Sequence, residues 1–144
     1  MKVKDVMLVD FPHVRRGMTL KEVVGLFTRK GMAGLPVVDE KGKVVGVIMR
    51  EDILHLYVPK EAGLLKGMPP GKREPQSLFQ VEGEFLQVED IMRKEDRTIT
   101  PNTGLVQAAV KMQKEGMEVL PVVQQKKLLG LLTSNQLYKA FFRK

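Results

Sequence analysis

The sequence is dominated by an internal repeat. Residues 31–52 read GMAGLPVVDEKGKVVGVIMRED, and residues 116–136 read GMEVLPVVQQKKLLGLLTSNQ. The segment VKDVM at the N-terminus also returns, as VEDIM at residues 88–92. Matching residues are 85 positions apart before the repeat's turn and 84 apart after it, so the second copy is one residue shorter there. Because such deletions fall in exposed turns, residues 40–43 are predicted to form one.

Each copy predicts a helix followed by two strands. In the first, an apolar stripe at helical spacing begins after Thr19, which with Glu22 forms a capping box, and Gly31 suits the end of the helix. The stripes are Leu20, Val23, Val24 and Phe27 in one copy, and Leu105, Ala108, Ala109 and Met112 in the other. Residues 35–38 and 44–48 are rich in β-branched side chains and predict a buried antiparallel hairpin.

Further short elements complete each unit. A polar helix start at Arg50 predicts a helix over residues 50–57, with Ile53, Leu54 and Tyr57 facing inward. Short strands are expected before the long helices, at residues 13–16 and 98–100. Pro36 cannot donate a backbone hydrogen bond, so it belongs at the beginning of its strand or on a sheet edge.

The repeat divides the chain into a first unit over residues 1–57, a linker over 58–87 and a second unit over 88–144. The linker is rich in proline and glycine. A unit of about 60 residues buries only a marginal fraction of its surface alone. The two units should therefore pack together.

Composition excludes several classes of function. The chain has no cysteine and two histidines, which disfavours metal sites, and neither histidine has the spacing of a catalytic site, so we expect no enzyme. No apolar run approaches the roughly 20 residues that cross a bilayer, and the N-terminus lacks the pattern of a signal peptide. We therefore expect a cytoplasmic protein without a membrane partner. The net charge of +7 favours anionic partners.

Both copies carry the same motifs in one order: xDVM, a capped helix ending in Gly-Met, LPVV, a turn, and Gly with two aliphatic residues. This paired pattern resembles a tandem pair of CBS domains, which is called a Bateman module. The resemblance implies an α+β fold in which two βαββα units pack as a pseudo-twofold disc. It further implies two clefts that can hold AMP, ADP, ATP, S-adenosylmethionine or a similar adenosyl ligand, with no obligatory cofactor.

The family's binding signature is Gly, two aliphatic residues, Thr or Ser, two variable residues and Asp. By this resemblance the Asp receives the ribose hydroxyls, and the Thr or Ser with the following helix N-terminus faces phosphate. The first copy keeps Asp52 but has Met49 at the hydroxyl position, whereas the second keeps Thr133 but has Gln136 at the acid position. Thr133 and Gln136 also form a capping box, which is a purely structural alternative for both.

The candidate site therefore comprises residues from both copies. If only one cleft binds, we expect the one that carries Asp52, because Asp52 has no capping role. Arg50 could meet a phosphate in the signature's variable gap, and a purine could lie against the Pro-Val pair of each hairpin. The candidates are Asp52, Arg50, Met49, Pro36, Val37, Arg15 and Arg16, with Thr133, Ser134, Gln136, Pro121, Val122, Thr98 and Thr100 from the second copy.

The resulting hypothesis is a non-catalytic regulatory module that senses an adenosyl ligand, forms a homodimer and passes its signal to an effector protein. Two alternatives stay open. One is a dimerisation scaffold whose ligand sites have degenerated. The other, less favoured because the basic residues are scattered and aromatic residues are few, is a nucleic-acid binder.

Overall fold

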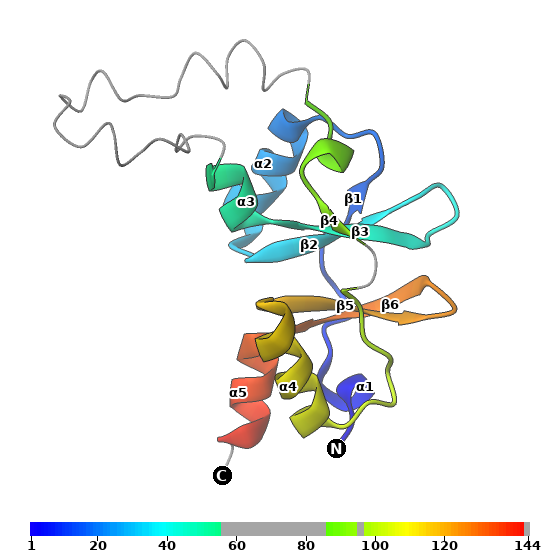
Figure 1. The fold of residues 1–144 in the computed structure, drawn as a ribbon, viewed down its shortest axis with the longest axis vertical. Helices are drawn as coiled ribbons and strands as arrows, with labels where there is room; N and C mark the ends of the chain where they lie inside the picture. The colour runs from blue at the N-terminus through cyan, green and yellow to red at the C-terminus, as the bar shows by residue number, and fades with distance from the viewer. Residues whose placement is uncertain (56–85, 95–96, 143–144) are drawn as a thin grey trace, which may run out of the picture.

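Two β-hairpins face each other, and helices cover their outer sides (Figure 1). The computed structural model describes residues 1–55, 86–94 and 97–142. The first hairpin, β2 (Gly34–Val38) and β3 (Val44–Met49), belongs to a four-stranded sheet of order β1-β2-β3-β4, and the second, β5 (Val119–Gln124) and β6 (Lys127–Thr133), forms a sheet of two strands. The α+β prediction and the packing of two units are confirmed. In the folded protein, the first unit is the half that contains β2 and β3, at the top of Figure 1, and the second unit is the half that contains β5 and β6, at the bottom.

The two long helices begin and end as predicted. They are α2 (Leu20–Lys30) and α4 (Leu105–Glu115). The hydroxyl oxygen of Thr19 accepts a hydrogen bond from the backbone N–H of Glu22 at 3.4 Å, which caps α2. Both helices end at a glycine in the left-handed conformation, with φ of 62° and 64°, which residues with a side chain adopt at a cost.

Both signature segments continue directly into helices, α3 (Arg50–Leu54) and α5 (Ser134–Phe141). Ile53 is buried, as expected, but Leu54 is 62% exposed, so its predicted inward orientation is wrong. Adjacent residues of a helix point in directions about 100° apart, so the burial of Ile53 leaves Leu54 facing solvent. The predicted continuation to Tyr57, and the predicted linker apart from its last two residues, lie outside the described residues.

The short strands before the long helices pair in parallel with the first strand of each hairpin. In the first unit β1 (Val14–Arg15) pairs with Val37 and Val38 of β2. Pro36 is the third of the five residues of β2, an inner strand, so the expected place at the beginning of the strand or on a sheet edge is wrong. It lies just before the stretch that β1 covers, where a missing N–H costs little. In the second unit the corresponding contact is a single bridge between Ile99 and Val122.

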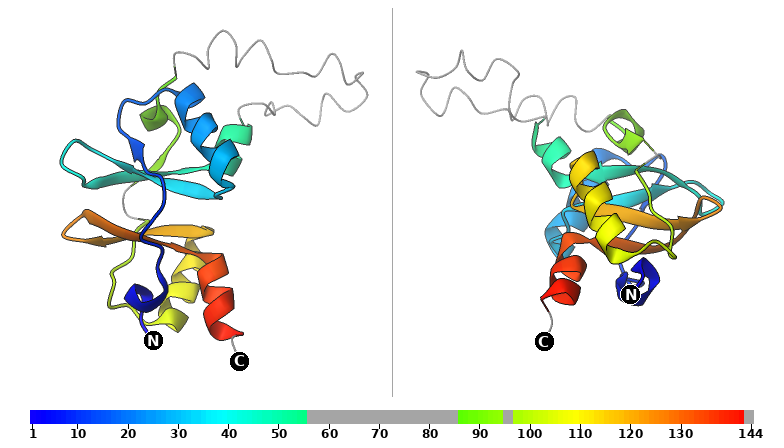
Figure 2. Two further views of the ribbon diagram at one scale, coloured as in Figure 1. Left: turned by 180° about the vertical axis from the view of Figure 1, so that it is seen from behind. Right: turned by 60° about the horizontal axis from the view of Figure 1, so that its bottom comes forward.

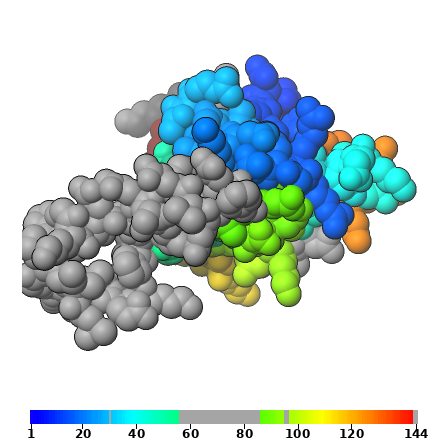
Figure 3. All heavy atoms as spheres, turned by 90° about the horizontal axis from the view of Figure 1, so that it is seen from above, coloured from blue at the N-terminus to red at the C-terminus, as the bar shows by residue number. Residues whose placement is uncertain are grey.

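The leading segments cross over between the units. In Figure 2, the N-terminal segment lies on the lower unit before the chain rises to β1. This segment carries α1 (Val3–Val6), and the backbone of Leu8 exchanges hydrogen bonds of 2.8 and 2.9 Å with Leu131 of β6. The second leading segment instead lies on the first unit, where it forms the 3₁₀ turn η5 (Val88–Asp90) and the strand β4 (Arg93–Lys94) beside β3. Figure 3 shows this segment in green against the blue residues of the first unit.

The crossing segments approach their strands very closely at two glycines. A Cβ atom on Gly46 would lie 2.6 Å from the carbonyl oxygen of Arg93, and one on Gly130 would lie 2.8 Å from that of Leu8. Both distances are shorter than real side chains show. The repeated glycine therefore admits the repeated segment.

The two hairpin tips also meet (Figure 3). The backbone N–H of Val44 donates to the carbonyl oxygen of Lys126 at 2.8 Å, and that of Leu128 donates to Gly42 at 3.3 Å. In the core between the sheets, Met49 and Val47 of β3 pack with apolar residues of the second unit. The units thus share both a core and a backbone connection.

Candidate functional site

A cleft lies between the two units at the start of α5. Its volume is about 380 Å³. We call it cleft 2, and it is lined by Leu8, Gly31, Met32, Ala33, Arg50, Glu118, Val119, Thr133, Ser134, Asn135, Gln136, Tyr138 and Lys139. It thus brings together four of the predicted site residues, with Arg50 contributed by the first unit and the other three by the second.

The end of β6 and the beginning of α5 position the polar side chains of cleft 2. The hydroxyl oxygen of Thr133 accepts the backbone N–H of Gln136 at 3.4 Å, and the hydroxyl donates to the side-chain carbonyl of Gln136. The N–H of Ser134 donates to the carbonyl oxygen of Glu118 at 2.9 Å, which fixes the beginning of α5 against β5. Thr133 and Gln136 therefore do cap the helix, as the structural alternative predicted, while they line the cleft.

An arginine spans the matching place in the first unit. We call this place cleft 1, where Asp52, Glu51, Arg93 and Met117 meet. The guanidinium of Arg93 donates from Nε to Oδ2 of Asp52 at 2.8 Å and from Nη2 to Oδ1 at 3.0 Å. The same Nη2 lies 2.7 Å from Oε1 of Glu51, and Nη1 lies 3.1 Å from the sulfur of Met117.

This ion pair is largely enclosed. The side chains of Arg93 and Asp52 are 23% and 18% exposed. The hydrogen bond to Asp52 raises the pKa of Arg93 above its ordinary value, so the guanidinium stays charged. Asp52 therefore has a structural role that was not foreseen, as the anchor of an arginine from the crossing segment.

The remaining predicted residues lie in the hairpins or on the surface. Pro36, Val37, Pro121 and Val122 are buried in their strands. Met49 is 2% exposed and packs beside Gly34 in the core between the units, so it begins α3 without a capping bond. Arg15 and Arg16 are exposed, and Thr100 shares a hydrogen bond with Thr103. None of these residues, nor Thr98, lines cleft 2.

Sequence reasoning missed the two residues that distinguish the clefts, Leu8 and Arg93. They occupy equivalent positions of the repeat, each next to the strongly matching DVM or DIM segment. Leu8 pairs with Leu131 and Arg93 with Val47, which are also equivalent. In the sequence, Leu8 belongs to the copy that carries Asp52, and Arg93 belongs to the copy that carries Gln136. Only the crossing of the leading segments brings Arg93 to Asp52, so the repeat itself held no direct signal for this contact.

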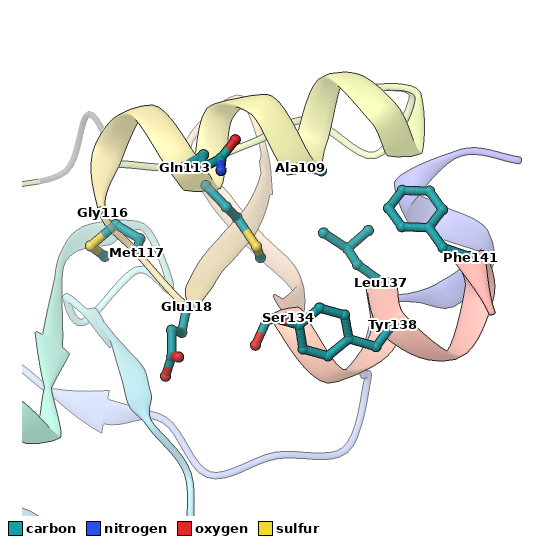
Figure 4. Close-up of a pocket in the computed structure, with 10 residues that line it drawn as sticks. Ala109, Gln113, Gly116, Met117, Glu118, Ser134, Leu137, Tyr138 and Phe141 are labelled. Carbon is teal, nitrogen blue, oxygen red and sulfur yellow. The ribbon is translucent and has the colours of Figure 1, made fainter.

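An apolar groove runs between the helices of each unit. Figure 4 shows the groove of the second unit, where Leu137, Tyr138 and Phe141 of α5 lie across from α4. Its volume is about 450 Å³, and the equivalent groove between α2 and α3 measures about 390 Å³. Several apolar side chains near the groove are exposed, and Phe142 reaches 78% exposure.

The described residues contain no cluster of three side chains arranged to hold a metal ion. Within the same part of the chain, every helix is too short or too polar to cross a bilayer.

Solved structures resemble this fold over its whole length. The CBS-pair protein CBSX2 from Arabidopsis thaliana matches with a TM-score of 0.80 and 25% identity, covering 99% of this chain and 94% of that one. A structure of CBSX2 in complex with AMP matches with a TM-score of 0.75 and 26% identity, covering 99% of this chain and 96% of that one.

Sequence relatives include proteins of similar length and much longer enzymes. An uncharacterized protein of Methanocaldococcus jannaschii is 27% identical over 97% of this chain and 90% of its own length. An L-aspartate semialdehyde sulfurtransferase of Methanosarcina acetivorans is 26% identical, but the chain spans only 24% of that enzyme. A homoserine O-acetyltransferase of Methanohalobium evestigatum is likewise matched over 23% of its length. Because the matches cover less than a quarter of each enzyme, they are no evidence that this chain shares the enzymes' catalytic activities.

The family model of the CBS domain matches residues 3–59 and 88–143. The match covers most of the chain and falls on the two copies of the repeat. The chain therefore belongs to the CBS-domain family, as a tandem pair.

Proposed function

We propose that the protein is a non-catalytic regulatory module that binds an adenosyl ligand, such as AMP, ADP, ATP or S-adenosylmethionine, between its two CBS units. The observation that carries this proposal is cleft 2. Its volume of about 380 Å³ lies within the range of about 300–1,000 Å³ that small-molecule sites occupy. Both units line it, so a ligand there contacts both.

The side chains of cleft 2 suit the parts of a nucleotide. Arg50 supplies a positive charge and the beginning of α5 supplies a helix N-terminus, and both attract a phosphate. Gln136 carries an amide that can donate to or accept from a ribose hydroxyl. Met32, Ala33 and Val119 provide apolar surface for a base. The AMP complex of CBSX2, a structural neighbour of 26% identity, supports this ligand class.

A ligand that bridges the units can act as a signal. It shifts an equilibrium between two arrangements only by its different affinity for them. Cleft 2 is formed partly by Gly31 and Arg50 of the first unit and partly by α5, so its shape depends on how the units are set against each other. The output is read by an effector protein that recognises one arrangement.

Exposed apolar side chains on α4 and at the end of α5 suit a homodimer. Four large apolar side chains there are between 44% and 78% exposed: Val106, Val110, Phe141 and Phe142. Exposed apolar side chains that gather in this way are typical of a surface that another protein covers. In an isologous dimer the same patch of each subunit faces the other, so one interface buries the exposed surface of both subunits. If no ligand binds, this dimer is the remaining function, and the protein is a scaffold.

The test is a thermal-shift panel with AMP, ADP, ATP and S-adenosylmethionine on the wild type, Arg50→Ala and Arg29→Ala. Arg29 is an exposed arginine of α2 that does not line cleft 2, so it is the matched control. One ligand at about 100 times its dissociation constant should add about 2.7 kcal/mol of stability to the wild type and to Arg29→Ala. Arg50→Ala should respond less, most clearly to the phosphorylated ligands. Failure of every ligand to shift the wild type would leave only the scaffold.

A further inference from the structure

The two clefts differ at a pair of positions that change together. Beside β3 the crossing segment presents Arg93, and the signature presents Asp52. Beside β6 the equivalent positions carry Leu8 and Gln136. One cleft therefore has a cation with an acid, and the other has two uncharged residues. A change at one position alone would leave a charge without its partner.

In cleft 1 the arginine engages the whole carboxylate. Both oxygens of Asp52 accept hydrogen bonds from Arg93, at 2.8 and 3.0 Å, in the two-pronged geometry that makes arginine and carboxylate pairs strong. A vicinal diol needs these same oxygens. The remaining donors of Arg93 reach Glu51 and the sulfur of Met117 in the second unit, so its side chain spans the space between the units.

In cleft 2 nothing equivalent happens. The side chain of Leu8 has no hydrogen-bond donor, and Leu8 lines a hollow of about 380 Å³ together with Gln136. The equivalent of Met117 is Met32, which also lines the hollow. In the same fold, one cleft is thus a hollow, whereas the side chain of Arg93 spans the other.

We propose that Arg93 is a positioning residue that closes cleft 1, so that the chain binds one adenosyl ligand, in cleft 2. This inference rests on the proposed function and adds the site and the stoichiometry. It reverses the choice that the sequence favoured, because the acid expected to hold the ribose is held by Arg93.

Electrostatics dictates how cleft 1 can be opened. Removing Arg93 alone leaves Glu51 and Asp52 facing the cleft, and two carboxylates repel a phosphate. The exchange must therefore replace both acids by their equivalents in the second copy, which are Gln136 for Asp52 and Asn135 for Glu51. The opened variant is Arg93→Leu with Asp52→Gln and Glu51→Asn, and the reciprocal closed variant is Leu8→Arg with Gln136→Asp.

The experiment is isothermal titration calorimetry of the full chain with AMP. The wild type should bind one AMP per chain, and the opened variant should bind two. The closed variant should show no binding, even with a dissociation constant up to 30 times that of the wild type. Arg93→Lys keeps a cation beside Asp52 and should stay at one, which separates the charge from the shape of the side chain. Thermal melts should show that every variant compared is folded.

The outcomes separate the inference from the proposed function. Two AMP molecules on the wild type, or one on the opened variant, would overturn the inference while the proposed function stands. If the closed variant does not fold, Gln136→Ala and Asp52→Ala replace it. Gln136→Ala should weaken the affinity for AMP at least fivefold. If Asp52→Ala weakens this affinity as much or more, the ligand lies in cleft 1 and the inference is overturned. If neither the wild type nor the opened variant binds AMP, the titration is repeated with ADP, ATP and S-adenosylmethionine, and failure of all four overturns both proposals.

Discussion

Cleft 1 and cleft 2 are built from the same repeated strands, turns and helices, yet one is spanned by an ion pair and the other is hollow. The backbone around them is equivalent, down to the glycine that admits each crossing segment. Among the side chains that differ, Arg93 and Asp52 form an ion pair in one half, whereas Leu8 and Gln136 line the hollow in the other. The comparison teaches that two copies of one backbone can carry an ion pair at one place and a hollow at the equivalent place.

The largest effect should come from the glycines that both halves share. Gly46→Ala places a Cβ 2.6 Å from a backbone carbonyl, and Gly130→Ala places one 2.8 Å away, so both should lose about 1–3 kcal/mol, with Gly46→Ala losing more. Urea denaturation measures both. Gly25→Ala, where nothing lies within 4 Å, is the control and should gain stability. Equal stability of Gly46→Ala and the wild type would contradict the close crossing.

The next effect should come from the ion pair that only one half contains. Arg93→Leu leaves two carboxylates without their partner and should cost about 1–3 kcal/mol, and adding Asp52→Gln should recover part of this loss. A double-mutant cycle by urea denaturation gives the coupling. Additive effects of the two substitutions would mean that the pair contributes no coupling energy.

The pH dependence of that coupling follows from the direction of the arginine's shift. A raised pKa gives stability that is fully present below the ordinary pKa of arginine and is lost only as the pH rises through the higher pKa of the folded state. The arginine's contribution should therefore stay constant from about pH 6 to 10. A loss within this window, measured by the same cycle, would contradict a charged Arg93.

A smaller effect should distinguish the two hairpin turns. In the first turn, the carboxylate of Asp39 accepts the backbone N–H groups of Lys41 at 2.8 Å and Lys43 at 3.0 Å. The bond from Lys43 lowers the pKa of Asp39 below 3.8, so its contribution is present above that pH and is lost as the pH falls through the lowered value. Asp39→Ala should lower the melting temperature at pH 7 but not at pH 2. A constant difference across this range would rule out the carboxylate as the cause.

The smallest effect should come from the second turn, which has no such carboxylate. Gln125 and Lys126 adopt φ values of 53° and 68°, which glycine adopts more easily. Lys126→Gly should therefore stabilise the protein by up to about 1 kcal/mol, although glycine also loses more freedom on folding. Lys127→Gly, at a strand position, is the control and should destabilise. The midpoint of urea denaturation decides between gain and loss.

Local features of the fold were predictable because neighbouring residues determine them. The stripe from Leu20 to Phe27 and the glycine after each helix depend on a few adjacent residues, and both helices form where expected. The hairpins follow from runs of β-branched residues around a turn. Leu54 was misplaced because a short apolar segment does not reveal which of two adjacent side chains faces the core.

The site was harder to predict because long-range pairing creates it. Nothing near Asp52 indicates a partner 41 residues away, since β4 reaches β3 only after the chain has passed through the rest of the first unit and the segment that follows it. The capping of α5 by Thr133 was predictable, because its partner Gln136 is three residues away. To predict which residues contact each other across the two units, one therefore has to know the topology as well as the motif.

The crossing of the N-terminal segment has a consequence for folding. Val3 bonds to the backbone of Thr103 and Leu8 to that of Leu131, so each contact closes a loop of at least 103 − 3 = 100 residues. Contacts so distant along the chain slow folding, because the entropy of closing the loop is lost before the contact forms. The N-terminal segment should therefore dock late, after β6 has formed.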